Sequence, residues 1–422
     1  MTNTTLPSGA SIAIIGAGII GVSSAYELAR KGYQVTIFDP EPPGEAGPSR
    51  ANAGHIGASD IYPLSAPGIH WKALKMLMSR DGALKIPLGE ALAQLPWFWR
   101  FLRTSRAIEF ERATNALSYL CSRTLTDTKA MLEAAGLNDL LAQNGCLFLY
   151  DSEQSLNASQ SGWVGKQAAG FASVEMDASE IARDVPGITD QYQHGVLSHQ
   201  WAMVSEPLDV VRGLARAAES EGVSFVKSRV NSYATSKIDV KLETANGSYQ
   251  HDAVIVAAGV GSAMFAKAGG DFLPIAAERG YNLTAPTPGV ELDLPLVFAD
   301  RGLVATQMTS GLRIGGWAEY ASPNRPPNQH YFKSIARISQ ALFPKLNLED
   351  ASYWMGSRPS MPDSVPVISQ SPNSDRVFYN CGHGHYGLTH AATSANILTD
   401  LIGGEPEGQK YQAYSITRFS DG

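Results

Sequence analysis

The sequence predicts a two-lobed protein that joins an α/β lobe, built on a parallel sheet, to an α+β lobe with a mixed sheet. The first indication is residues 11–39, where an apolar run is followed by glycines, an amphipathic segment and a second apolar run. The second is a group of strand-like segments between residues 145 and 354. The third is the length of 422 residues, which one hydrophobic core rarely reaches.

The stretch that begins at Ser11 has the pattern of a βαβ unit. Ile12–Ile15 is continuously apolar, as expected for a strand buried on both faces. Gly16, Gly18 and Gly21 then fit G-x-G-x-x-G, in which the glycines allow a tight turn, close approach to a pyrophosphate and close packing of helix on strand. We therefore predict a dinucleotide site at the start of the following helix.

The second strand of this unit, Val35–Phe38, ends in Asp39. An acid about twenty residues beyond the glycines is the expected partner of a ribose hydroxyl. It also disfavours a 2′-phosphate and hence NADP, so the βαβ unit by itself leaves FAD and NAD open.

Later segments return to this lobe and make it discontinuous. Asp252–Ser262 is an apolar strand running into glycines, and Val377–Asn380 is a further strand before a helix at Leu388–Ile402. The boundaries that we predict are 1–85, 205–271 and 355–422 for the nucleotide domain, and 86–204 and 272–354 for the substrate domain.

The second lobe is expected to mix helices and strands. A helical pattern runs from His70 to about Leu141 and includes the aromatic cluster Trp97, Phe98, Trp99 and Phe101, which we interpret as core. Strands are predicted at 145–150, 275–283, 303–308 and 312–319, with a helix at 332–342; a further helix at 206–223 belongs to the nucleotide domain.

Composition excludes several classes of protein. The net charge of −7 and the absence of a run of lysines and arginines exclude a basic surface for binding nucleic acid. Three widely spaced cysteines form no metal or redox pattern and are read as buried thiols. There is no signal-peptide pattern and no apolar run of eighteen residues, so we expect a cytoplasmic protein that does not span a membrane, with peripheral attachment left open.

Seven motifs in order resemble the FAD-dependent D-amino-acid dehydrogenases, within the D-amino-acid oxidase and glycine oxidase superfamily. The resemblance covers nearly the whole chain. The motifs are the glycine fingerprint at 16–21, SRANAG at 49–54, YPLSAPG at 62–68, ERGYNLT at 278–284, RIGGWAE at 313–319, GSRPSMPDSVPVI at 356–368 and GHGHYGLT at 382–389.

The resemblance implies a Rossmann-type domain that binds FAD non-covalently. It also implies oxidation of an amino acid at its α-carbon, with hydride passing to flavin N5 and the imino acid hydrolysing to a 2-oxo acid and ammonia. The electron acceptor, whether quinone, oxygen or a partner protein, is left open. Two alternatives remain: an enzyme for imino or N-substituted amino acids, or a flavoprotein subunit of a larger electron-transfer complex.

The motifs depart from the family pattern close to the expected substrate pocket. His55 stands where such dehydrogenases usually have Gln, and GSRPSMPDS and GHGHYGLT differ from the usual GLRPMTPDG and GHGTLGWT. These departures leave the substrate open, with D-proline, hydroxy-D-proline, sarcosine and opines as candidates.

Five residues are candidates for substrate chemistry. Arg358, in what reads as a GSRP turn, is similar to the carboxylate-binding arginine of glycine oxidase, and a guanidinium suits a carboxylate because it can bind in a bidentate manner. The alternative is a structural pair with Asp363. Tyr281 is a candidate for the same carboxylate, and His55, Tyr62 and His385 for the ring or the amine.

The glycines at 382–387 lead into a helix whose N-terminal end could stabilise negative charge on the reduced flavin. Three histidines near it lack further ligands at metal spacing, so we predict no metal site. The residues expected to contact FAD are Gly16, Gly18, Ile19, Ile20, Gly21, Asp39, Pro40, Ser49, Arg50, Asn52, Ala53, Gly54, Val230, Ala258, Gly259, Gly382, His383, Gly384, His385, Tyr386, Gly387, Leu388 and Thr389.

Overall fold

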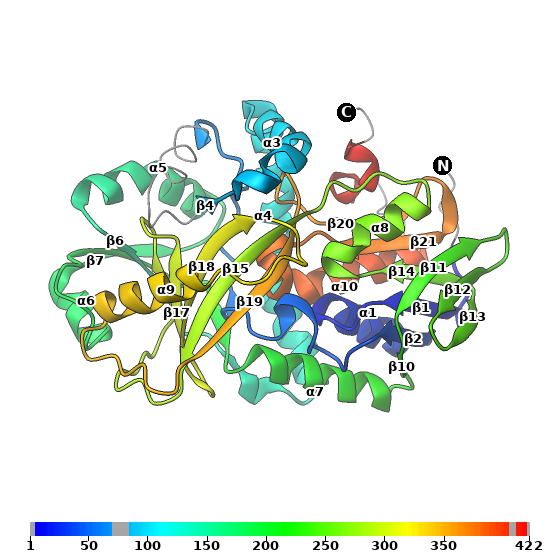
Figure 1. Cartoon of the computed structure of the whole chain (residues 1–422), viewed down its shortest axis with the longest axis horizontal. Coiled ribbons are helices and arrows are strands. Elements are labelled where there is room, and N and C mark those ends of the chain that lie inside the picture. The colour runs from blue at the N-terminus through cyan, green and yellow to red at the C-terminus, as the bar shows by residue number, and fades with distance from the viewer. Residues whose placement is uncertain (1–4, 70–83, 405–410, 420–422) are drawn as a thin grey trace.

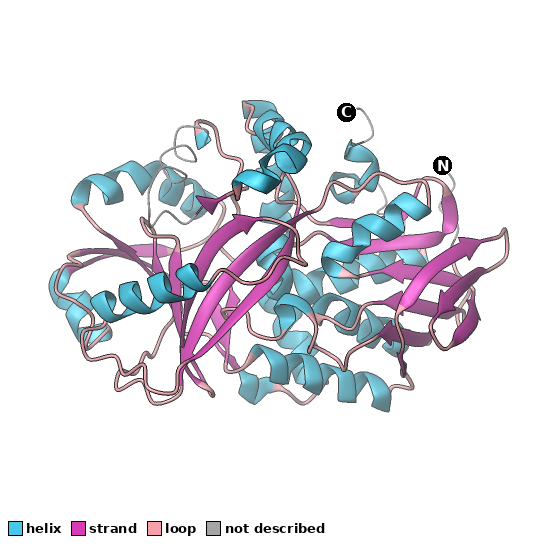
Figure 2. Ribbon diagram, viewed as in Figure 1, coloured by secondary structure: helices cyan, strands magenta, loops and turns pink. Residues whose placement is uncertain are grey.

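The structure is a computed structural model that describes residues 5–69, 84–404 and 411–419. Two lobes lie side by side, with the parallel sheet on the right of Figure 1 and a large mixed sheet on the left; Figure 2 shows the helices around each. The helical pattern expected from His70 lies outside the described residues as far as residue 83.

The first lobe is built on a sheet with the strand order β10-β2-β1-β14-β21-β20. All neighbouring pairs are parallel except β20 with β21 at one edge. The strands are β1 (Ser11–Ile15), β2 (Gln34–Asp39), β10 (Ser224–Lys227), β14 (Ala253–Val256), β20 (Val367–Ser371) and β21 (Ser374–Cys381). Its strands come from three separate parts of the chain, so the predicted discontinuity of this lobe is confirmed.

The two faces of this sheet bury alternate residues of the same strands. Ile12 and Ile14 contact one core shared with α1 (Ile19–Arg30), α7 (Pro207–Ser220) and α10 (Gly387–Gly403). Ala13 and Ile15 face the other core, covered by the meander β11–β13 (Val230–Thr235, Val240–Thr244, Gly247–His251) and by α8 (Ser262–Ala268). A strand buried on both sides must be apolar throughout, as the sequence predicted.

The second lobe contains a sheet of nine strands in the described residues, seven of them in the order β15-β18-β17-β16-β6-β8-β7, with β19 beside β15 and β4 beside β18. The strands are β4 (Leu84–Lys85), β6 (Cys146–Tyr150), β7 (Ser173–Asp177), β8 (His194–Ser198), β15 (Ala276–Ala285), β16 (Leu296–Phe298), β17 (Leu303–Met308), β18 (Gly311–Tyr320) and β19 (Ser352–Ser360). This confirms the strands predicted in both parts of the lobe.

Helices cover this sheet and connect the lobes. They are α3 (Ala91–Thr104), α4 (Ala107–Ala134), α5 (Glu153–Ala168), α6 (Ala178–Asp184) and α9 (Gln329–Leu342). A small sheet of β3 (His55–Ile56), β9 (Ala202–Val204) and β5 (Leu141–Ala142) lies between the two large ones. The long helix α4 packs against α10 in the core of the first lobe. No helix in the described ranges is long and apolar enough to cross a bilayer.

Two sequence expectations need correction. Trp97 is buried, but Trp99 is 63% exposed, so the aromatic cluster is not entirely core. Arg358 lies in strand β19 rather than in a turn, and the domain boundary predicted at 354/355 falls inside that strand. All three cysteines are buried and free, as expected.

Candidate active site

A cavity of about 780 Å³ lies where the two lobes meet. Its walls come from the loop after β2, from β15, β18 and β19 of the large sheet, from α3, and from the start of α10. Its size and its mostly apolar lining, with a few polar groups, are those of a cofactor and substrate site. Arg358, His55, His385 and Tyr281 all line it, so four of the five predicted substrate-site residues meet in one place.

The glycine fingerprint is built as its spacing predicts. Gly16 has a φ of +113°, and a Cβ there would lie 2.5 Å from the carbonyl oxygen of Ala257. A Cβ on Gly21 would collide with the Gly16 carbonyl, so α1 can pack on the strand only with glycine at this position. The Ser49 hydroxyl accepts a hydrogen bond from the Ile19 amide at 3.0 Å at the start of α1.

Asp39 holds the same turn from the end of β2. Its Oδ2 accepts from the Ala17 amide at 2.8 Å, and its Oδ1 accepts from the Glu41 amide at 2.9 Å. The carboxylate therefore fixes the backbone of the glycine loop. The ribose contact expected of it stays a prediction.

The loop predicted to wrap the flavin is pinned by the second lobe. Asn282 of β15 donates to the Ala51 carbonyl at 2.7 Å, and Arg313 of β18 donates to the Asn52 carbonyl at 2.9 Å. Arg313 is itself paired with Glu206 at 3.1 Å. Sequence analysis missed Asn282 and Arg313, although both stand within the family motifs.

The start of α10 closes the cavity from the other side. Gly382 has a φ of +78°, and a Cβ there would press on Met361. Thr389 lines the cavity and accepts from the Gly57 amide at 3.2 Å. Tyr386 and Gly387 begin the helix, so its N-terminal end faces the cavity as predicted.

Two histidines near this helix point into the protein instead. His383 is hydrogen-bonded to Ser394 and His390 to Thr124, and burial lowers the pKa of each to about 3. Both rings are therefore neutral at pH 7. Within the residues that the structure describes, no group of three metal-binding side chains occurs.

The charged centre of the site is Glu278 of β15, which sequence analysis assigned no role. Its side chain is fully buried, and Oε1 lies 2.9 Å from both Arg358 Nη1 and His385 Nε2. Ser360 and Tyr320 donate to Oε2 at 2.8 and 3.2 Å. Burial acts to raise the pKa of Glu278, but His385, Arg358 and Ser360 together lower it to about 2. The available signal was an acid next to an arginine inside a predicted strand.

Arg358 reaches the cavity from β19. Nη1 donates to Glu278 and, at 2.9 Å, to the carbonyl of Trp317. The alternative pairing with Asp363 is wrong, because Asp363 binds Arg418 at 2.8 Å. In the described part of the chain Arg358 Nη2 has no hydrogen-bond partner, so one edge of the guanidinium is open to the cavity.

Trp317, which supplies that carbonyl, has an unusual backbone. Its φ is +66°, a left-handed value that is rare for a bulky residue, and the pairing of β15 with β18 shifts register here. A bulge of this kind redirects the strand at a functional site. The bulge presents the Trp317 carbonyl to Arg358.

Tyr281 lines the cavity and Tyr62 does not, but the hydroxyls of both are bound within the protein. The side chain of Tyr281 lies on the other side of β15 from that of Glu278. Its hydroxyl donates to Glu319 at 2.6 Å, and its ring packs against Tyr331 and Phe332. Tyr62 stacks on Phe110, and its hydroxyl donates to a carbonyl of α5. The substrate roles expected of these two tyrosines stay predictions.

His55 does line the cavity, with Nε2 2.6 Å from the Thr306 hydroxyl. Burial lowers its pKa to about 4, so the ring is neutral at pH 7. Among the other expected FAD contacts, Val230 is buried in the core under the meander, Ala258 and Gly259 follow β14, and Arg50 is exposed and paired with Glu45.

The residues present fit FAD. Gly16 and Gly21 leave no room for a Cβ, which keeps the turn tight at the start of α1, and the cavity continues from the loop at 48–57 to the start of α10. Gly16, Gly18 and the first residues of α1 would hold the pyrophosphate. Asn52, Ala53 and Thr389 would hold the flavin end.

Comparisons with known proteins agree with this architecture. Residues 11–401 match the family model described as DAO, FAD dependent oxidoreductase. A D-amino-acid oxidase of Bradyrhizobium diazoefficiens is 31% identical over 98% of this chain and 100% of its own length. A D-amino acid dehydrogenase of Cereibacter sphaeroides is 32% identical over 97% of this chain and 95% of its own.

Solved structures share the fold at lower identity. Glycine oxidase of Geobacillus kaustophilus has a TM-score of 0.75 at 19% identity, over 97% of this chain and 99% of that one. L-proline dehydrogenase of P. horikoshii has a TM-score of 0.72 at 17% identity, with 99% of each chain covered. The chain belongs to the DAO family of FAD-dependent oxidoreductases, which act on amino acids.

Proposed function

We propose that this protein oxidises a D-amino acid at its α-carbon, giving an imino acid that hydrolyses to the 2-oxo acid and ammonia. The D configuration is proposed because the two curated relatives at 31% and 32% identity are named for D-amino acids. FAD, when bound, supplies the hydride acceptor at N5. The remaining chemistry depends on residues of this chain.

The observation that carries the proposal is the difference between two arginines that line the cavity. Arg313 donates to Thr284, Asn52 and Glu206 and is nearly buried, so its donors are occupied within the protein. Arg358 is bound through Nη1 alone, and its side chain is 21% exposed toward the cavity. A substrate carboxylate can therefore bind the open edge of Arg358.

The surroundings of Arg358 fit the rest of an amino acid. Leu95, Phe98 and Leu102 of α3 and Trp354 of β19 give the cavity an apolar wall. An apolar side chain of the substrate would exclude water there. His55 is neutral at pH 7 and adds no positive charge near the substrate nitrogen, which must lose its proton before hydride leaves the α-carbon.

The test is an anaerobic panel of amino acids added to the purified, FAD-loaded protein. We expect the flavin absorbance to bleach with D-amino acids that carry apolar side chains and to stay unchanged with their L enantiomers. Bleaching confined to sarcosine, D-proline or opines would instead identify an enzyme for N-substituted amino acids. Bleaching with no member of the panel would contradict the proposal.

A further inference from the structure

Glu278 joins two side chains that line the cavity. Its Oε1 lies 2.9 Å from both Arg358 Nη1 and His385 Nε2. Its Oε2 accepts hydrogen bonds from Ser360 and Tyr320. A carboxylate has about four acceptor positions, so all of them are occupied within the protein. Glu278 can therefore act on a substrate only through its neighbours.

The contact with Glu278 fixes the position of the hydrogen on the His385 ring. Burial acts to raise the pKa of Glu278, but its hydrogen-bond donors lower it to about 2. The carboxylate is therefore ionised at pH 7 and can only accept hydrogen bonds. Nε2 of His385 must then carry the hydrogen, and Nδ1 of the neutral ring carries a lone pair.

That lone pair belongs to a side chain that is open to the cavity. His385 comes from the turn Gly384–Tyr386 and is 34% exposed. Among the residues that the structure describes, Nδ1 of His385 has no hydrogen-bond partner. His55 differs, because its Nε2 is bound to Thr306 and burial lowers its pKa to about 4. His385 is therefore better suited than His55 to take a proton.

Arg358 and His385 are close enough to hold one amino acid. Their nitrogens contact the same oxygen of Glu278, so they lie within about twice 2.9 Å of each other. The function proposed above places the substrate carboxylate on the open edge of Arg358. In an α-amino acid the nitrogen is two bonds away from the carboxylate carbon. The amino group of a substrate bound to Arg358 is therefore within reach of His385.

We propose that Glu278 is a positioning residue that holds His385 with Nδ1 toward the substrate, and that Nδ1 takes one proton from the substrate ammonium group. The inference rests on the proposed oxidation of an amino acid. The N–H bond breaks, its electron pair stays on the substrate nitrogen, and the proton adds to Nδ1. As hydride leaves the α-carbon for FAD, this electron pair forms the C=N bond of the iminium product. Glu278 stabilises the imidazolium through Nε2, and the ring later returns the proton to water.

The groups around His385 allow its protonation to be followed by pH. Those that line the same cavity or lie beside it are Glu278 of β15, Arg358 of β19, Tyr320 of β18, Tyr386 and His383 next to it in the chain, and Asp60 of the loop after β3. Burial raises the pKa of both tyrosines and lowers that of His383 to about 3. Asp60 is paired with Lys166 at 3.2 Å. A change in activity near neutral pH therefore reports His385 or the substrate itself.

The first test is the pH dependence of kcat/KM for the FAD-loaded enzyme with a D-amino acid that bleaches the flavin. We expect kcat/KM to fall on the acid side, where the ring is protonated before substrate binds. His385→Gln keeps a donor for Glu278 in the place of Nε2 but has no acceptor in the place of Nδ1, so it should lower kcat/KM at pH 7 roughly a hundredfold. The loss should shrink as the pH rises, because the free amino acid then loses its ammonium proton in solution.

A second readout does not depend on turnover. Nitrogen NMR of the histidine-labelled, FAD-loaded protein without substrate reports which ring nitrogen carries hydrogen. At the pH of highest kcat/KM, we expect a neutral His385 ring protonated at Nε2, assigned by the signal that is lost in His385→Gln. Glu278→Gln has an amide that can donate to Nε2, so the hydrogen should move to Nδ1 and kcat/KM should fall roughly a hundredfold or more.

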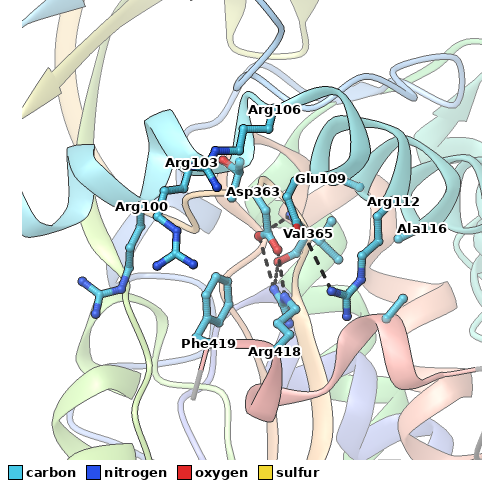
Figure 3. A pocket seen from close by; sticks show the side chains of 13 residues that line it. Arg100, Arg103, Arg106, Glu109, Arg112, Ala116, Asp363, Val365, Arg418 and Phe419 are labelled. Atoms are coloured by element: carbon cyan, nitrogen blue, oxygen red, sulfur yellow. Dashed lines mark hydrogen bonds and ion pairs between the residues drawn. The ribbon is translucent and has the colours of Figure 1, made fainter. Parts of the chain in front are cut away.

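Matched controls separate this role from the loss of a buried ion pair. Asp363 pairs with Arg418 at 2.8 Å beside an arginine-lined hollow outside the cavity (Figure 3). Asp363→Asn removes the charge of a comparable carboxylate–arginine pair, so it should lower stability and leave the pH profile unchanged. His199→Gln, at an exposed histidine, should change neither.

Two results would overturn the inference. They are a hydrogen on Nδ1 of His385 in the wild-type spectrum, and an unchanged pH profile of kcat/KM in His385→Gln. If the flavin bleaches with a D-amino acid and either result is found, the proposed function stands and the proton transfer to His385 is wrong. If no amino acid bleaches the flavin, the proposed function fails and the proton transfer fails with it, whatever the NMR spectrum shows.

Discussion

Two buried arginine–glutamate pairs lie on opposite faces of strand β15. Arg279 pairs with Glu319 of β18 at 3.1 Å on the face toward α9, and Glu278 pairs with Arg358 of β19 at 2.9 Å on the face toward the cavity. The chemical groups are the same and the glutamates are equally buried. The surroundings of the two guanidinium groups differ.

Arg279 is enclosed. It is fully buried, and besides Glu319 it donates to the carbonyls of residues 325 and 326 and to the sulfur of Met355. Arg358 is held on one edge and left open on the other. A guanidinium that is enclosed by the protein can only hold the fold, whereas one with an edge open to the cavity can bind a ligand. The comparison therefore separates a structural arginine from a binding one.

The largest effect is expected from Arg279→Met, which leaves Glu319 charged and unpaired in the interior. We expect a loss of about 3–5 kcal/mol in the free energy of unfolding, measured by urea denaturation. The remaining folded enzyme should keep its KM. Adding Glu319→Gln should recover part of the stability. A change in KM without a loss of stability would contradict the structural role.

Acid should destabilise the open pair through Glu278. Its pKa is about 2 in the folded protein against 4.5 for the ordinary group, so its contribution is complete above pH 4.5 and is lost as the pH falls toward 2. This amounts to about 3 kcal/mol. Denaturation at pH 5 and pH 3 should show a smaller loss in Glu278→Gln than in the wild type, while the exposed control Glu349→Gln should follow the wild type.

Removing the open edge itself should affect catalysis more than stability, because Glu278 keeps His385, Ser360 and Tyr320 as partners. Arg358→Ala is expected to lower kcat/KM for the amino acid roughly a hundredfold, mainly through KM, with an unchanged content of FAD. Arg358→Lys keeps the charge but not the planar fork, so it should recover only part of the loss. An unchanged kcat/KM in Arg358→Ala would show that another group binds the substrate carboxylate.

What could be predicted from sequence depends on whether a feature rests on neighbouring residues or on contacts between distant strands. The glycine turn depends on local spacing, and Gly16, Gly18 and Gly21 lie within one short segment. The parallel strands are apolar on both faces, so their pattern is visible without any partner. The fold and the cofactor end of the cavity were therefore predictable.

The charged centre depends on contacts between distant strands. Glu278 meets Arg358 because β15 pairs with β19 in a register that places them opposite each other, and His385 arrives from the start of α10. The contact of the Tyr281 hydroxyl with Glu319 could not be predicted either, because the side of a strand on which a residue lies depends on the pairing, and a one-residue shift exchanges the faces. Resemblance pointed to Arg358, but neither motif nor spacing indicated its buried partner.

The smallest effect should come from Gly280, which follows Arg279 on β15 and lies opposite Gly356 of β19. A Cβ at this position would lie 2.5 Å from Arg358 Cζ, so Gly280→Ala should displace the guanidinium without touching Arg279. Because the displaced atoms end a flexible side chain, we expect little loss of stability and a rise in KM of about tenfold. Steady-state kinetics beside Gly403→Ala, where a Cβ meets open space, gives the comparison. An unchanged KM would show that substrate binding tolerates a displaced guanidinium. The charge of Arg358 would then matter for binding and its exact position would not.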